Sequence, residues 1–111
     1  MSIPPASQPS DSNPQNPQGL GTNLPSVLIV ESDERLAHTI GVDLHEAGYT
    51  PLEVHNLRAA LSHARMASPS LIVVARRLRE ESGLELCRQL RAEKSKVPIL
   101  LMMAQDELVD R

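Results

Sequence analysis

Few side chains in this sequence are of a type that carries out chemistry. His38 and His45 lie seven residues apart and so share one face of a helix, but a metal pair needs closer spacing and a third ligand. His55 and His63 show no ligand pattern, and Cys87 has no neighbouring base to activate its thiol. We therefore predict that His38 and His45 are surface histidines, that Cys87 is a buried structural cysteine and that there is no metal site.

Catalytic sequence motifs are also missing. The sequence contains no phosphate-binding loop, no nucleophile elbow and no zinc spacing, so we predict no cofactor and no enzymatic activity. Two groups of charged residues are still of interest, and each follows an apolar run. Residues 31–34, Glu-Ser-Asp-Glu, come after the first run, and Arg76, Arg77 and Arg79 come after a later one.

The elements that position these groups alternate between strand and helix patterns. Apolar runs predict strands at residues 26–30, 71–75 and 97–102, with a weaker strand at 49–54, where Pro51 indicates a sheet edge. The helix after the first strand is capped by Ser32 or Asp33, carries apolar residues at fourfold spacing and ends at Gly48. Its apolar face is formed by Leu36, Ile40 and Leu44, with Ala37 and Ala47 alongside.

Two further helices follow the second and third strands. Asn56 caps one of them, which closes at Ser68-Pro69. The other starts at Gly83 and directs Leu84, Cys87 and Leu90 toward the core. Residues 76–82 between them are expected to form a polar loop, and residues 106–111 to begin a fourth helix. Met102 and Met103 continue the fourth strand and are predicted to lie in the core.

This βαβαβαβ(α) order predicts an α/β fold with a doubly wound parallel sheet and helices on both faces. The strand spacing places a fifth strand at roughly residue 120, so we expect four of the usual five strands and a chain that ends in mid-fold. The predicted domain covers residues 26–111. Residues 1–25 hold six of the nine prolines among Ser, Gln and Asn, and we predict a disordered tail.

Composition narrows the choice of partners and location. With 11 basic and 14 acidic residues the net charge is −3, and the chain has one Tyr and no Trp or Phe. We therefore predict no nucleic-acid partner and no membrane partner. The apolar runs are too short to span a bilayer, there is no secretory signal pattern, and the single cysteine fits a reducing compartment, so we expect the cytoplasm.

Taken together, the segments resemble the receiver domain of bacterial two-component response regulators, which has a flavodoxin-like fold. Seven pieces occur in the family's order over residues 26–111. They are Val27-Leu28-Ile29-Val30-Glu31, Leu44-x-x-x-Gly48-Tyr49, Ala60-Leu61, Pro69-Ser70-Leu71-Ile72-Val73-Val74, Gly83-Leu84-Glu85-Leu86-Cys87-Arg88-x-Leu90-Arg91, Val97-Pro98-Ile99-Leu100 and Ala104-Gln105-Asp106-Glu107-x-x-Asp110-Arg111.

The resemblance implies a site for phosphoryl transfer, and this sequence departs from it. In the family an acidic pair binds Mg²⁺, an aspartate accepts the phosphoryl group, and a Thr or Ser and a Lys bind its oxygens. Here the acidic pair corresponds to Glu31 and Ser32, the acceptor to Ala75 and the Thr or Ser to Met103, while the Lys position lies beyond Arg111. One of five site residues is retained, so we predict a domain that accepts no phosphate.

Positive charge surrounds the acceptor position, where a Mg²⁺ site would need carboxylates. Arg76, Arg77 and Arg79 have two interpretations. They form a solvated loop that pairs with Glu80 and Glu81, or one of them fills the former metal position and pairs with Glu31. We also expect them to contribute to a surface for partner docking.

Three functional hypotheses follow. The first is a degenerate receiver that acts by binding proteins, with a histidine kinase or another response regulator as partner. The second is a fragment of a longer, DNA-binding regulator. The third is a small-molecule binder at the strand carboxyl ends. The strand at 97–102 also leaves an apolar sheet edge open, which predicts self-association.

Overall fold

The computed structural model describes residues 24–104. In this part of the chain four parallel strands form one sheet in the order β2-β1-β3-β6. The strands are β1 (Ser26–Val30), β2 (Thr50–Val54), β3 (Leu71–Ala75) and β6 (Ile99–Met102). The predicted parallel α/β sheet is confirmed. The tail up to residue 23 and the predicted helix at 106–111 lie outside the described residues.

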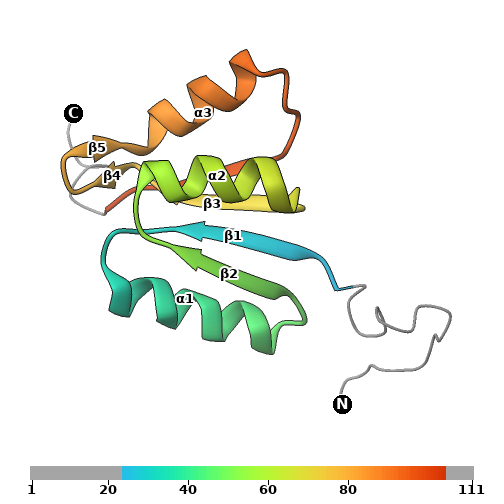
Figure 1. The fold of residues 1–111 in the computed structure, drawn as a ribbon. Coiled ribbons are helices and arrows are strands. Elements are labelled where there is room, and N and C mark those ends of the chain that lie inside the picture. The colour runs from blue at the N-terminus through green and yellow to red at the C-terminus, as the bar shows by residue number, and fades with distance from the viewer. Residues whose placement is uncertain (1–23, 105–111) are drawn as a thin grey trace, which may run out of the picture.

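Three helices cover the two faces of this sheet: α1 (Glu34–Glu46) on one face, and α2 (Leu57–Ala67) and α3 (Gly83–Ala92) on the other (Figure 1). Each helix begins at a side-chain cap. Asp33 Oδ1 accepts hydrogen bonds from the N–H groups of Arg35 and Leu36, at 3.0 and 3.2 Å. Asn56 Oδ1 accepts one from Ala59 N–H at 2.8 Å. Both predicted caps are thus confirmed, and they fix where the helices start.

Alternation of side chains along the strands divides the core into two layers. Val27, Ile29 and Val73 face α1, where they pack with Ala37 and the half-buried Ile40 and Leu44. The alternate strand residues, Leu28, Val30, Ile72 and Val74, face α2 and α3. Both layers are nearly free of polar groups, so the sheet is buried on both faces, as its continuous apolar runs predict.

The two outer strands of the described sheet are β2 and β6. Among the described residues β2 pairs only with β1, which confirms the edge position that Pro51 predicts. In residues 24–104 β6 pairs only with β3, in a register that sets Ala75 opposite Met102. Leu100 on β6 is 56% exposed. The strand is shorter than the predicted 97–102.

The prediction of a polar loop at residues 76–82 is wrong. This segment forms an antiparallel hairpin of β4 (Arg77–Leu78) and β5 (Glu81–Ser82), and Arg79 in its turn adopts a left-handed φ of 55°. Leu78 is 1% exposed and belongs to the same buried cluster as α2 and α3. One apolar side chain among charged neighbours thus anchors the hairpin to the core.

The predicted core face of α3 is also wrong in part. The buried residues of this helix are Gly83, Leu86 and Leu90. Leu84 is 41% exposed and Cys87 is half-buried, so only Leu90 of the predicted set lies fully in the core, and the cysteine is not the buried thiol we expected. The helix is turned this way because Gly83 packs directly against the end of β3.

Candidate functional site at the strand carboxyl ends

A cleft of about 470 Å³ opens where β1, β3 and β6 end. We call it the strand-end cleft. Strand ends and the residues that follow them supply most of its wall, and the start of α1 supplies the rest. Its lining residues are Glu31, Leu36, Ile40, Ala75, Arg76, Arg77, Met102, Met103 and Ala104. The fold therefore brings together five of the candidate site positions singled out in the sequence: Glu31, Ala75, Arg76, Arg77 and Met103.

Glu31 is the acidic group of this cleft. It follows β1 directly and is 8% exposed, the one charged side chain among the buried residues of the described chain. Its backbone N–H donates to Val54 O at 3.1 Å, and its Oε2 accepts from Asp33 N–H at 2.9 Å. The carboxylate is thus held in place by the turn that leads into α1, and its burial is partly compensated by that hydrogen bond.

Ala75 ends β3 in the wall of the cleft and is 7% exposed. A methyl side chain has no nucleophilic atom, so this position cannot form an acyl phosphate. The next residue is fixed on both sides through its backbone. Arg76 N–H donates to Met102 O, and Arg76 O accepts from Gly83 N–H, both at 2.8 Å. These two bonds tie the end of β3 to β6 and to the start of α3.

Met103 follows β6 and is 40% exposed, so it borders the cleft with a thioether and is not the core residue we expected. Met102 does pack against both core layers, which confirms its prediction. A thioether is at best a weak acceptor and donates no hydrogen bond. The β6 side of the cleft therefore offers an apolar wall, joined by Leu36 and Ile40 of α1.

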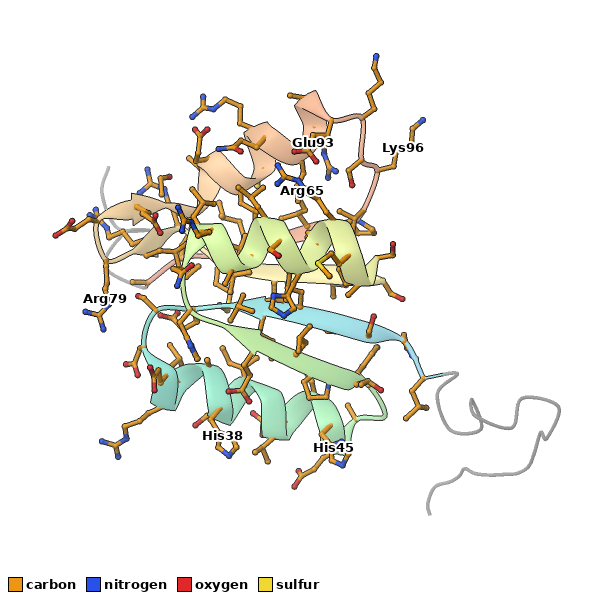
Figure 2. The ribbon with its side chains drawn as sticks, viewed as in Figure 1. His38, His45, Arg65, Arg79, Glu93 and Lys96 are labelled. Carbon is orange, nitrogen blue, oxygen red and sulfur yellow. The ribbon has the colours of Figure 1, made fainter. Side chains whose placement is uncertain are left out.

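Ser32 and Arg79 lie apart from Ala75. Both line a second hollow of about 480 Å³, together with Asp33, Glu34 and Arg35. Figure 2 shows Arg79 at the hairpin, extending away from the sheet. A third hollow, of about 330 Å³, is lined by Arg76, Arg77, Arg79, Glu80, Glu81 and Ser82. The three arginines therefore form one positively charged border around the strand ends, which we call the arginine cluster.

Glu81 has a role that the sequence did not reveal. Its Oε1 accepts a hydrogen bond from Leu57 N–H at 3.0 Å, so the hairpin supplies a second cap for α2. The two residues are 24 positions apart, and only the folded hairpin brings them together. This contact couples the segment that carries the arginine cluster to α2.

The remaining candidates do not assemble into a site. Residues 24–104 contain no group of three or more His, Cys, Asp or Glu side chains that could hold a metal ion. His38 and His45 are exposed on α1 (Figure 2). His38 Nδ1 lies 3.3 Å from Glu53 Oε2 on β2, a contact between helix and edge strand. The prediction of surface histidines holds for this pair.

Side chains with a shifted pKa lie on the surface of α2 and α3, away from the cleft. Hydrogen bonds from Arg65 hold the pKa of Glu93 below its ordinary value, and the same contact raises the pKa of Arg65 (Figure 2). A hydrogen bond from Gln89, aided by Arg88, lowers the pKa of Glu85. Arg65 and Glu93 form a surface ion pair that links α2 to the end of α3, whereas the contacts of Glu85 lie within α3, so we assign these groups no functional role.

The chain belongs to the response regulator receiver domain family of two-component systems, because residues 27–111 match that family. It is 33% identical over 85 residues to the alkaline phosphatase synthesis transcriptional regulatory protein PhoP of Bacillus subtilis. It is 34% identical over 88 residues to the sensory transduction protein RegX3 of Mycobacterium tuberculosis. These matches cover 77% and 79% of the chain but only 35% and 38% of the two relatives.

Solved structures give the same fold. A CheY-like receiver domain from Methylobacillus flagellatus superposes with a TM-score of 0.70 at 23% identity, over 80% of this chain and 77% of that one. An alanine-for-aspartate mutant of the MaeR response regulator, bound to sulfate, gives a TM-score of 0.68 at 25% identity, over 77% and 71% of the two chains. The flavodoxin-like sheet and the family resemblance are thereby confirmed. No helix in residues 24–104 has the length and apolar character needed to cross a membrane.

Proposed function

We propose that this receiver domain accepts no phosphoryl group and acts by binding another signalling protein. The observation that carries the proposal is Ala75 at the carboxyl end of β3, facing the cleft beside Glu31. The neighbouring positions agree with it. Ser32 provides one neutral oxygen in place of a carboxylate, and Met103 provides a thioether in place of a hydroxyl. A divalent metal held mainly through carboxylates would find one such group among the described residues that line this cleft.

The proposed partner is a histidine kinase or another response regulator. The docking surface would combine the exposed start of α1 with the arginine cluster, because both border the same hollows at the strand ends. Exposed charge of one sign accelerates association with a partner of opposite charge. A cytoplasmic histidine kinase domain with an acidic docking face fits this surface.

The test uses purified histidine kinases from the source organism, each incubated with the full chain. We expect one kinase to bind the chain without transferring phosphate to it. Replacing Arg76, Arg77 and Arg79 together by Ala should weaken that binding, whereas the matched change of three exposed arginines on α2 and α3, Arg58, Arg88 and Arg91, should not. Phosphotransfer to the chain, or binding that is unchanged in the triple variant, would contradict the proposal.

A second candidate is supported by the length of the relatives. The chain spans little more than a third of two regulators that it matches, PhoP and RegX3, and PhoP is a transcriptional regulator. We therefore also propose that these residues serve as the receiver part of a longer DNA-binding regulator. Reading the coding sequence past Arg111 distinguishes the two candidates: an in-frame effector domain supports the second, and a stop codon supports the first.

Self-association through β6 is the remaining proposal. Within the described residues β6 has one neighbouring strand, and Leu100 is 56% exposed. An edge strand with an exposed apolar side chain favours pairing with another chain. Sedimentation of the full chain should show a concentration-dependent dimer that Leu100→Lys suppresses. A monomer at all concentrations would contradict it.

A further inference from the structure

The two helix layers that cover the sheet carry opposite charge. α1 lies on one face of the sheet, and α2 and α3 lie on the other (Figure 1). Residues 33–53 hold five acidic side chains and one basic one, a balance of −4. Residues 57–67 and 83–96, which form α2, α3 and the start of the next loop, hold six basic side chains and two acidic ones, a balance of +4. The net charge of −3 therefore does not reflect the charge of either layer.

We call the surface of the first layer the acidic face. Its carboxylates are those of Asp33, Glu34, Asp43, Glu46 and Glu53, and all but the half-buried Glu53 are exposed. Glu53 belongs to β2, but its Oε2 lies 3.3 Å from His38 Nδ1 on α1. Asp33 accepts hydrogen bonds from backbone N–H groups at the start of α1. These partners carry no permanent positive charge, so they do not cancel the charge of the acidic face.

We call the surface of the second layer the basic face. Its cations are the exposed side chains of Arg58, Arg65, Arg88, Arg91, Lys94 and Lys96. The two carboxylates of this layer are already paired, because Glu93 contacts Arg65 and Glu85 contacts Arg88. Four cations remain beyond these two pairs. One of them, Arg91, donates to two backbone carbonyl groups, which hold its guanidinium without neutralising it.

Each face also exposes an apolar side chain. Val42 on α1 is 41% exposed, and Met66 on α2 is 82% exposed. Protein interfaces combine an apolar centre with a polar rim, whereas exposed ion pairs alone contribute little. An interface that covers the two faces would remove both side chains from water.

We propose that the acidic face of one copy of this chain docks on the basic face of a second copy. The partner is a second copy because the chain itself supplies a surface of opposite sign and equal magnitude, and complementary surface charge favours encounter in the correct orientation. The two faces lie on opposite sides of the sheet, so the contact is head-to-tail. Such a heterologous contact leaves one face of each kind open and builds a ring or an open chain. It differs from the edge pairing proposed for β6, which involves neither face.

The test is sedimentation velocity of the full chain in about 10 mM and about 1 M sodium chloride, between which the Debye length falls from about 30 to about 3 Å. We expect a sedimentation coefficient that rises with protein concentration at low salt and returns to the monomer value at high salt. Leu100→Lys, which suppresses pairing through β6, should leave this association in place. Added salt does not weaken apolar pairing, so the salt dependence separates the two contacts.

Two triple variants each reverse one face. They are Glu34→Lys with Asp43→Lys and Glu46→Lys for the acidic face, and Arg58→Glu with Lys94→Glu and Lys96→Glu for the basic face. Each should weaken association about tenfold or more, because like charges then face one another. The first variant carries a net charge of +3, the same magnitude as the −3 of the wild type, so a larger net charge cannot explain its loss. All six substitutions together make the faces opposite in sign again and should restore association.

Two further variants serve as controls. Glu80→Lys at the hairpin lies outside both faces and should leave association unchanged. Lys94→Gln with Lys96→Gln should weaken association in the same direction as the reversal of the basic face, and it is expected to leave the fold intact because both side chains are exposed.

The proposal is overturned by a monomer at all concentrations in low salt, or by association that added salt leaves unchanged. Association that survives the reversal of either face would overturn it too. So would a folded six-substitution variant that stays monomeric, because complementary faces would then not be sufficient.

Discussion

Gly83 at the start of α3 lies against the backbone of Ala75 at the end of β3. A Cβ built on Gly83 would meet the carbonyl oxygen of Ala75 at 2.1 Å and Val74 Cγ2 at 2.9 Å. No side chain larger than a hydrogen atom fits this contact. Because Gly83 N–H also donates to Arg76 O, the same glycine sets both the rotation of α3 and the position of the arginine cluster.

Gly83→Ala should therefore destabilise the domain. The new methyl group would meet backbone atoms, which cannot move aside as a side chain can, so α3 would have to shift away from β3. We expect a loss of about 1–3 kcal/mol or more in the free energy of unfolding, the usual cost of overpacking a core. Urea denaturation followed by circular dichroism measures it.

Gly41→Ala is the matched control. A Cβ there would meet Glu53 Oε2 at 2.7 Å, but that atom is the far end of a flexible side chain. Alanine is favoured over glycine inside a helix by about 1 kcal/mol, which offsets the displacement of Glu53. The stability should change by less than about 1 kcal/mol. An equal loss in both variants would show that the contact with Ala75 is not the cause.

Leu78→Ala should cost about 2–5 kcal/mol, because the side chain is 1% exposed and packs in the main core cluster. The hairpin that bears Arg77 and Arg79 should loosen with it, which faster amide exchange at residues 77–82 would report. Leu100→Ala serves for comparison, because Leu100 is 56% exposed and its truncation should lower the free energy of unfolding only slightly. Similar losses in the two variants would mean that the hairpin is not anchored through Leu78.

The regular elements could be predicted from the sequence because their signals are local. Caps at Asp33 and Asn56 and the edge position of Pro51 each depend on a few neighbouring residues, and the structure confirms them. Contacts between distant segments left no such signal. Leu84 and Leu86 are equally apolar, and only the approach of Gly83 to Ala75 decides which of them faces the core.

The candidate site shows the same difference between features with a local sequence signal and features that depend on distant contacts. The strand ends at Glu31, Ala75 and Met103 follow from the parallel topology, so their meeting in one cleft could be anticipated. The hairpin could not be predicted, because its two strands have only two residues each. Its one buried side chain, Leu78, stands among charged residues and gives no periodic apolar pattern. The hydrogen bond from Leu57 N–H to Glu81 depends on that hairpin, so it could not be predicted from the sequence either.

Glu81→Ala should destabilise α2 from a distance. Removing the carboxylate leaves Leu57 N–H without its cap, and loss of a helix cap costs about 0.5–2 kcal/mol. The neighbouring exposed Glu80→Ala gives the control, because it removes the same charge without this hydrogen bond. Amide exchange at the first turn of α2 should accelerate in the first variant only. If Leu57 exchanges at the same rate in both, Glu81 does not act as a cap.

Ion pairing between Arg65 and Glu93 predicts a pH-dependent link between α2 and α3. Hydrogen bonds from Arg65 Nε at 3.1 Å lower the pKa of Glu93 in the folded state below its ordinary value of 4.5. A depressed carboxyl pKa stabilises the fold above the unfolded pKa, and this contribution is lost as pH falls through the folded pKa.

The wild type should accordingly melt at a higher temperature than Glu93→Gln at neutral pH, and this difference should disappear under acid conditions. Because both side chains lie on the surface, the gap should also narrow as salt is added. Glu80→Gln changes the same charge at the hairpin and should show no such closing. A gap that stays constant from neutral pH down to acid unfolding would contradict the assignment of the low pKa to Glu93.

Ala75→Asp restores a nucleophile to the end of β3, yet it should not restore phosphorylation by itself. Acetyl phosphate and Mg²⁺ should leave the single variant without a stoichiometric mass increment, because Ser32 still supplies a neutral oxygen and Met103 still donates no hydrogen bond. The arginines beside the new carboxylate also compete with Mg²⁺ for it. Adding Ser32→Asp and Met103→Thr should raise incorporation above the single variant, as measured by intact-protein mass spectrometry. Full phosphorylation of Ala75→Asp alone would show that the acceptor is the only function lost from this cleft.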